Sequence, residues 1–259
     1  MICSERTLMP RLGGRKLLVK LQSRLPDEFQ LGRDKFFDFL RDNQLLIRRR
    51  RNRVKTTFSN HWLHKYPNLV KDFVPDGPHQ LWESDITYVE TQQGFICLFL
   101  ITDAYSRKIV GWSVSDTMEA DNAVIALQMA LSQLPANVKE LYHHSDRGVQ
   151  YCSHKYVKIL EKNSIRISMT EHGDPLENAV AERINGILKD EWLKDMKQMP
   201  MFIVKKQMTD IIAIYNTQRP HSSVDMLTPE QAHRLSGHLK RHWKNYWKVK
   251  SASCELATE

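Results

Sequence analysis

The 259-residue sequence lacks the features of a secreted or membrane-spanning protein. Its longest strongly apolar run, Phe95–Ile101, is far shorter than the roughly 20 residues that a membrane-spanning helix needs. Basic residues interrupt the N-terminal segment, so no secretory signal is present. The four cysteines lie far apart and form no Cys-x-x-Cys pair, which argues against a disulfide framework or a cysteine-rich zinc site. We therefore expect a cytoplasmic protein.

Charge is distributed unevenly along the chain. Residues 1–75 contain 17 Lys and Arg against 7 Asp and Glu, residues 76–237 contain 16 against 21, and residues 238–259 contain 5 against 2. A basic beginning and a basic end therefore flank an acidic centre, within a formal net charge of +8. Basic segments favour a polyanionic partner, and an acidic centre repels one unless its carboxylates bind cations. We expect the chain to be organised in these three regions.

The densest basic run comprises five arginines: Arg48, Arg49, Arg50, Arg51 and Arg53. Such a run can neutralise several phosphates and release their counterions, which gives affinity without sequence preference. A solvated linker is the alternative interpretation. In the tail, residues 240–248 alternate basic with aromatic side chains, as surfaces that bind nucleic acid often do. Packing of these aromatic residues onto the core explains that pattern equally well.

Hydrophobic periodicity predicts an α/β core. Residues 10–75 are predicted to be mostly helical, with prolines marking a linker at their end. Strands are predicted at 81–89, 95–102, 108–114, 138–144 and 165–169, and helices at 120–134, at 156–160 and from 175 onward. This order predicts a mixed five-stranded sheet flanked by helices and preceded by a small helical domain.

Three carboxylates are candidates for catalysis. Asp85 lies within the first predicted strand, Asp146 lies at the end of the fourth, and Glu182 lies opposite the apolar stripe of the last helix. Lys189 follows Glu182 by seven residues, which places it about 20° away around the helix. A strand-end aspartate alone is weak evidence, since such residues commonly cap turns. Asp85 and Asp146, together with Glu182 and the nearby ammonium group of Lys189, indicate a phosphate-bearing partner.

Four motifs occur in order and can be compared with known families. They are Trp82-x-x-Asp85-Ile-Thr-Tyr, His144-Ser-Asp146-Arg147-Gly-x-Gln-Tyr, Asn178-Ala-x-x-Glu182 and Tyr215-Asn-x-x-Arg219-Pro-His. In this order they resemble the OrfB-type transposases of bacterial insertion sequences, whose core is similar to retroviral integrase and ribonuclease H. The resemblance covers roughly residues 10–235.

The resemblance implies a ribonuclease-H-like catalytic core over residues 76–237, a helix-turn-helix-like DNA-binding region over 1–75 and a basic, aromatic tail over 238–259. It implies a polynucleotidyl transferase that cleaves DNA and transfers strands. Its catalytic and metal-binding residues would be Asp85, Asp146 and Glu182, which would hold two Mg²⁺ ions or Mn²⁺ in their place. Lys189, Arg147 and the arginine run would contact DNA.

The resemblance also implies partners. The protein would act on element ends and target DNA as a homo-multimer in a synaptic complex, in the cytoplasm and associated with the nucleoid. An OrfA-type partner frame or a frameshift fusion is expected.

A plain nuclease of the same fold and a DNA-binding regulator with an inactive core are the alternatives. Tyr151 suggests a tyrosine recombinase, but no Arg-His-Arg setting surrounds it.

Overall fold

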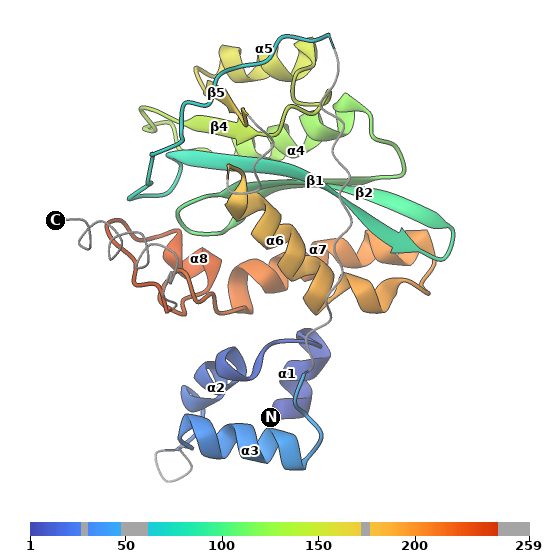
Figure 1. Ribbon diagram of the computed structural model, residues 1–259, viewed down its shortest axis with the longest axis vertical. Helices are drawn as coiled ribbons and strands as arrows, with labels where there is room; N and C mark the ends of the chain where they lie inside the picture. Colours follow the sequence, from blue (N-terminus) through green and yellow to red (C-terminus); the bar gives the residue numbers. More distant parts are fainter. Residues whose placement is uncertain (27–30, 48–61, 172–176, 243–259) are drawn as a thin grey trace, which may run out of the picture.

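A five-stranded mixed sheet forms the centre of the molecule (Figure 1). The computed structural model describes residues 1–26, 31–47, 62–171 and 177–242. The strand order is β3-β2-β1-β4-β5. β1 pairs with β2 and β2 with β3 in antiparallel fashion, whereas β1 pairs with β4 and β4 with β5 in parallel. The predicted mixed sheet is confirmed, and its strands are β1 (Leu81–Thr91), β2 (Gly94–Asp103), β3 (Ile109–Ser115), β4 (Tyr142–Ser145) and β5 (Arg166–Met169).

Helices cover both faces of this sheet. In Figure 1, α4 (Ala120–Ser132) and α5 (His154–Lys162) lie above it, and α6 (Ala179–Glu191) and α7 (Met201–Gln218) lie below it. The side chains of β2 alternate between the two layers, because Leu98 and Leu100 join the core below while Phe99 and Ile101 join the core above. A strand buried on both faces is expected to be apolar throughout, which explains the continuous hydrophobic run in β2.

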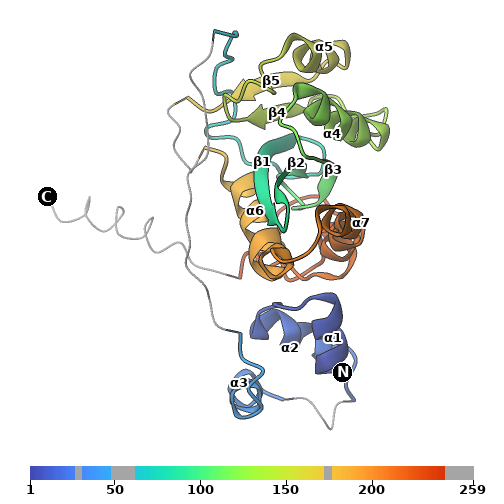
Figure 2. The same cartoon turned by 90° about the vertical axis from the view of Figure 1, so that its right-hand side faces the viewer.

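The N-terminal region consists of three helices, α1 (Ile2–Leu8), α2 (Gly14–Gln22) and α3 (Arg33–Asp42). The region lies below α6 and α7 in Figures 1 and 2, and it contacts η2 (Leu193–Met196), the 3₁₀ turn after α6. The indole Nε1 of Trp192 donates a hydrogen bond to the backbone oxygen of Leu8 at 3.0 Å. Arg11 forms an ion pair with Asp195 at 3.0 Å. The predicted helical character is thus present, although α1 precedes the predicted start at residue 10.

Residues 62–75 form neither helix nor strand, so the helical prediction is wrong before Pro67, whereas the linker that the prolines predict accounts for the rest. This segment lies along β5 instead. The backbone N–H of Met169 donates to the oxygen of Pro67 at 3.2 Å, and the N–H of Leu69 donates to Oγ of Ser168 at 2.9 Å. Pro67 and Pro75 interrupt the segment, and proline is incompatible with a helix interior. The backbone groups therefore find partners on the sheet.

Two predicted boundaries shift in the structure. β4 begins at Tyr142 rather than at residue 138, because a turn follows Pro135, with the N–H of Val138 donating to its oxygen at 3.3 Å. α5 begins at His154, two residues earlier than predicted, because Ser153 caps it by accepting a hydrogen bond from the N–H of Tyr156. Serine is a favoured residue at this position.

The C-terminal part of the described chain folds back along the loop that follows α7. The N–H of Asp225 donates to the oxygen of Lys240, and the N–H of His242 donates to the oxygen of Ser222, both at 2.8 Å. Residues 238–242 of the predicted tail are therefore held against the core, and its remainder lies outside the described residues. In the described ranges, no helix combines the length and apolarity needed to span a bilayer.

Gly111 supports the contact between β3 and α4, and we predict that it cannot be replaced. A Cβ atom at this position would lie 2.2 Å from the backbone oxygen of Ala126 and 2.9 Å from Cβ of Ala130. Gly111→Ala should lower the free energy of unfolding by about 1–3 kcal/mol or more, as overpacking does. Urea unfolding followed by circular dichroism measures this loss.

Gly186 provides the matched control, because a Cβ there would meet nothing within 4 Å. It lies inside α6, where alanine is favoured over glycine by about 1 kcal/mol. Gly186→Ala should therefore leave stability unchanged or raise it. Equal effects of the two substitutions would contradict the proposed close contact at Gly111.

Candidate active site

Parallel pairing of β1 with β4 places Asp85 and Asp146 at the same edge of the sheet. The last paired residues are Ser84 and Ser145, and the two aspartates follow directly after them. Asp146 begins a tight turn, in which Oδ1 accepts a hydrogen bond from the N–H of Gly148 at 2.9 Å. A Cβ at residue 148 would lie only 2.9 Å from the same oxygen, which explains the glycine. In α/β sheets, strand ends of this kind commonly hold functional groups.

Glu182 reaches this edge from the first turn of α6. Asn185, one turn further along the helix, donates a hydrogen bond from Nδ2 to Oδ2 of Asp85 at 2.7 Å. At the start of the helix, Nδ2 of Asn178 donates to the backbone oxygen of Ser84 at 3.0 Å. Contacts on both sides of Glu182 therefore fasten α6 to β1. The side chain of Glu182 itself is exposed to solvent.

The negative charges of Asp146 and Glu182 both act on Asp85. The pKa of Asp85 is raised from 3.8 to about 7, chiefly by burial and then by the negative charge of Asp146. Glu182 also raises this pKa, whereas the hydrogen bond from Asn185 opposes the increase. Asp146 and Glu182, the other two acidic residues selected from the sequence, thus both lie within electrostatic range of Asp85.

The predicted basic residues fall into two groups. Lys189 is partly buried, and burial lowers its pKa while the negative charge of Asp85 acts in the opposite direction. It therefore lies within electrostatic range of the carboxylates, on the same helix as Glu182. Arg147 directly follows Asp146 and is partly exposed. The arginine run, Arg48, Arg49, Arg50, Arg51 and Arg53, lies outside the described residues.

The donor set fits a hard divalent cation in its chemistry. Magnesium prefers oxygen ligands and is usually bound through one or two carboxylates together with substrate phosphate. The raised pKa of Asp85 reflects burial and repulsion among carboxylates, and a nearby cation would offset both. Within the described parts of the chain, no three His, Cys, Asp or Glu side chains are already arranged as a metal site.

Buried aromatic and histidine side chains support the strand that leads to Asp146. Nε2 of His143 lies 2.7 Å from Oγ of Ser84 and 2.8 Å from the hydroxyl of Tyr156. Burial, more than any other cause, lowers the pKa of His143 to about 3, so this ring is neutral at ordinary pH. Tyr151 is only 2% exposed, and burial raises its pKa strongly. Both observations argue against Tyr151 as an accessible nucleophile.

The fourth sequence motif, Tyr215 to His221, has a structural role. The hydroxyl of Tyr215 donates to the backbone oxygen of Arg107 at 2.9 Å. Asn216 exchanges two hydrogen bonds of 2.9 Å with the backbone of Ile109, which lies at the start of β3. Arg219 is 0% exposed, and its Nε and Nη2 donate to the carboxylate of Glu191 at 2.7 and 2.6 Å. The motif therefore joins the end of α7 to β3 and to the end of α6.

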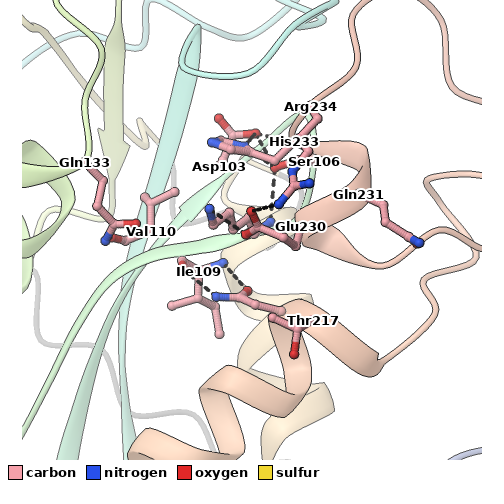
Figure 3. Close-up of polar contacts among 12 residues, drawn as sticks. Asp103, Ser106, Ile109, Val110, Gln133, Thr217, Glu230, Gln231, His233 and Arg234 are labelled. Atoms are coloured by element: carbon pink, nitrogen blue, oxygen red, sulfur yellow. Dashed lines mark hydrogen bonds and ion pairs between the residues drawn. The ribbon is translucent and has the colours of Figure 1, made fainter.

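A second polar cluster lies where β2 ends, beside α8 (Pro229–Ala232) (Figure 3). Oδ1 of Asp103 accepts hydrogen bonds from the N–H and the hydroxyl of Ser106 at 2.8 and 2.7 Å, and Nδ1 of His233 lies 2.9 Å from the same hydroxyl. The residue types are those of a Ser-His-Asp catalytic triad, but Asp103 and Ser106 are 0% exposed, so no substrate can reach the serine. The cluster therefore caps a turn and holds α8 in place.

Comparisons with known proteins agree with this architecture. Residues 75–175 and 163–229 each match a family described as Integrase core domain. The chain is 35% identical over 225 residues to the insertion element IS600 uncharacterized 31 kDa protein of Shigella sonnei, covering 84% of this chain and 82% of that protein. It is 36% identical over 196 residues to the transposase InsF for insertion sequence IS3A of Escherichia coli (strain K12), covering 74% and 67%.

One solved structure shows the same fold at low sequence identity. It is the intasome of simian T-cell lymphotropic virus in complex with the PP2A regulatory subunit B56 gamma. The similarity has a TM-score of 0.54 at 18% identity, and it covers 73% of this chain and 65% of the chain in that structure.

We predict that Arg219→Ala destabilises the fold severely. Removing the arginine leaves the carboxylate of Glu191 in a largely buried place without its main hydrogen-bond partner, and breaking a buried pair costs about 3–5 kcal/mol. Arg166→Ala is the control, because its pair with Glu140 is exposed and should contribute about 1 kcal/mol or less. Urea unfolding of both variants checks the expected order, and similar losses would contradict the structural role of Arg219.

We also predict a pH-dependent stability difference at Asp85. Between about pH 4 and 7 the unfolded chain has lost this proton while the folded chain retains it, so the contribution of Asp85 to stability falls as the pH rises. Asp85→Asn lacks this titration and should gain stability relative to the wild type across that window. Unfolding in urea and a metal chelator, at several pH values, measures the difference. A difference that stays constant with pH would contradict the raised pKa.

Proposed function

The chain belongs to the transposases of bacterial insertion sequences that have an integrase core, and we propose that Asp85, Asp146 and Glu182 are its catalytic residues. In this proposal the protein cuts the ends of its element and joins them to target DNA with divalent metal ions. The observation that carries it is the pairing of Ser84 with Ser145, after which Asp85 and Asp146 follow side by side.

The proposed metal site uses the three carboxylates. Asp85, Asp146 and Glu182 would together hold two Mg²⁺ ions, for which Mn²⁺ can substitute. When bound, such ions activate the attacking oxygen and neutralise charge on the phosphate and the leaving oxygen. Asn185 supports the arrangement, because its hydrogen bond fixes Oδ2 of Asp85 before any ligand is present.

Basic side chains of the same site would hold the DNA. Lys189 lies within electrostatic range of Asp85, so its ammonium group can bind a phosphate beside the carboxylates. Arg147 extends from the same turn as Asp146. The arginine run at residues 48–53 would add contacts to the DNA backbone that do not depend on sequence.

The chemistry proposed here requires no covalent protein–DNA intermediate. Water would attack the phosphodiester at the element end and release its 3′-hydroxyl. At the same carboxylates, this hydroxyl would then attack a phosphodiester of target DNA, whose own 3′-oxygen would leave. The burial of Tyr151 supports this direct route over a tyrosine-linked one. We further propose that the protein works as a homo-multimer in a synaptic complex, with an OrfA-type partner or as a frameshift fusion, on DNA in the bacterial cytoplasm.

We predict that Asp85→Asn, Asp146→Asn and Glu182→Gln each reduce cleavage and strand transfer by about 10³-fold or more. The reason is that loss of a metal-bound carboxylate removes several kcal/mol of transition-state stabilisation. Cleavage of labelled element ends and their joining to a target plasmid, with Mg²⁺ or Mn²⁺, measure both steps. DNA binding, followed by gel mobility, should persist in all three variants.

Two control variants complete this experiment. Asp121→Asn removes an exposed carboxylate that pairs with Lys155, and it should retain wild-type activity. Tyr151→Phe removes the alternative nucleophile and should also remain active. Normal cleavage by Asp146→Asn would overturn the catalytic assignment. Cleavage by the wild type without joining would indicate a plain nuclease, and binding without cleavage would indicate a regulator.

A further inference from the structure

The first turn of α6 is capped by a neighbouring strand rather than by its own preceding residue. Asn178 occupies the N-cap position and belongs to a residue type that commonly caps helices, but its side chain makes no capping hydrogen bond. The carboxylate of Glu83, on β1, takes over this task. Its Oε2 accepts hydrogen bonds from the N–H groups of Val180 and Ala181 at 3.0 and 3.1 Å.

This cap combines several favourable interactions. The first N–H groups of a helix have no partner within the helix, and Glu83 satisfies two of them. A carboxylate also interacts favourably with the positive end of the helix dipole, and hydrogen bonds to a charged acceptor are stronger than neutral ones. Glu83 is only 7% exposed, so water competes little for these bonds. Burial raises the pKa of Glu83, and its two backbone hydrogen bonds and the positive charge of Arg107 oppose that rise.

We propose that Glu83 is a positioning residue that fixes Glu182 relative to Asp85. Glu83 and Asp85 are two residues apart on β1, so their side chains leave the same face of the sheet. The N–H of Ala181 donates to Glu83, and Ala181 directly precedes Glu182. Asn185 attaches the next turn of the helix to Asp85. Glu182 therefore lies between two points at which α6 is bound to β1.

The placement of Asp85 relative to Asp146 does not depend on this cap. Asp85 and Asp146 are related by the pairing of β1 with β4, which does not involve Glu83's side chain. Loss of the cap should consequently loosen the first turn of α6 and Glu182, with Asn178 still bound to Ser84, while the two aspartates keep their relation. This separation distinguishes a positioning role from general support of the fold.

Amide hydrogen exchange of the metal-free protein tests the proposal. In Glu83→Ala the amides of residues 180–182 should exchange about tenfold faster or more, as expected for a lost helix cap, while the amides of β4 stay protected. Glu83→Gln keeps an acceptor oxygen and should stay within about threefold of the wild type. Glu90→Ala is the matched control, because Glu90 lies on the same strand and pairs with exposed Lys197.

The outcomes of this measurement are decisive. Unchanged exchange in Glu83→Ala would overturn the proposal, and so would equal acceleration in Glu83→Ala and Glu90→Ala. Equal acceleration in the Ala and Gln variants of Glu83 would show that hydrogen-bond acceptance is not the cause, and would also overturn it. Should Glu83→Ala fail to fold, the comparison of Glu83→Gln with the wild type still tests whether an acceptor oxygen preserves the cap.

A second measurement concerns activity and rests on the proposed function. Glu83→Ala should lower kcat for strand transfer about tenfold or more with KM for DNA within about twofold, and Glu83→Gln should restore most of it. In a Glu182→Gln background, Glu83→Ala should cause no further loss, because Glu83 acts through Glu182. Additive losses would overturn the positioning role. An inactive wild type would refute the proposed function and leave the exchange result intact.

Discussion

The parallel pairing of β1 with β4 is the constraint on which the rest of the site depends. It aligns Ser84 with Ser145 and thereby brings together two aspartates that are 61 positions apart in the sequence. The antiparallel strands β2 and β3 extend the sheet on the other side of β1, so β1 is central and carries residues of both layers. Two of the three acidic residues consequently come from paired strands, and only the third comes from a helix.

The basic N-terminal region uses much of its charge internally. Glu5 is buried and accepts ion pairs from Lys20 at 2.8 Å and from Arg24 at 2.6 Å. Arg11 pairs with Asp195 on η2, and Lys16 lies 3.8 Å from the carboxylate of Glu191. The positive charge counted from the sequence therefore overstates what residues 1–26 offer to a polyanion. Part of that charge holds the helices together and connects them to the core.

Much of the fold was predictable from local patterns. Alternation and apolar runs located all five strands, and helical periodicity located α4 and α6, because these signals reflect burial on one or two faces. The prolines marked a linker from Pro67, but its hydrogen bonds to β5 could not be predicted, because they join segments distant in sequence. The family resemblance selected Asp85, Asp146 and Glu182. The roles of Glu83 and Asn185 could not be predicted, since both depend on where α6 meets β1.

Arg219 has a consequence for shortened copies of the coding sequence. Its guanidinium group comes from the end of α7, yet it binds the carboxylate at the end of α6, the helix that carries Glu182 and Lys189. A copy interrupted after codon 191 and before codon 219 would still encode every proposed catalytic residue and Glu191. Its product would nevertheless carry a poorly solvated carboxylate without this arginine, and would be exposed to proteolysis before it met DNA. The products of such shortened copies should be degraded and should therefore show no enzyme activity.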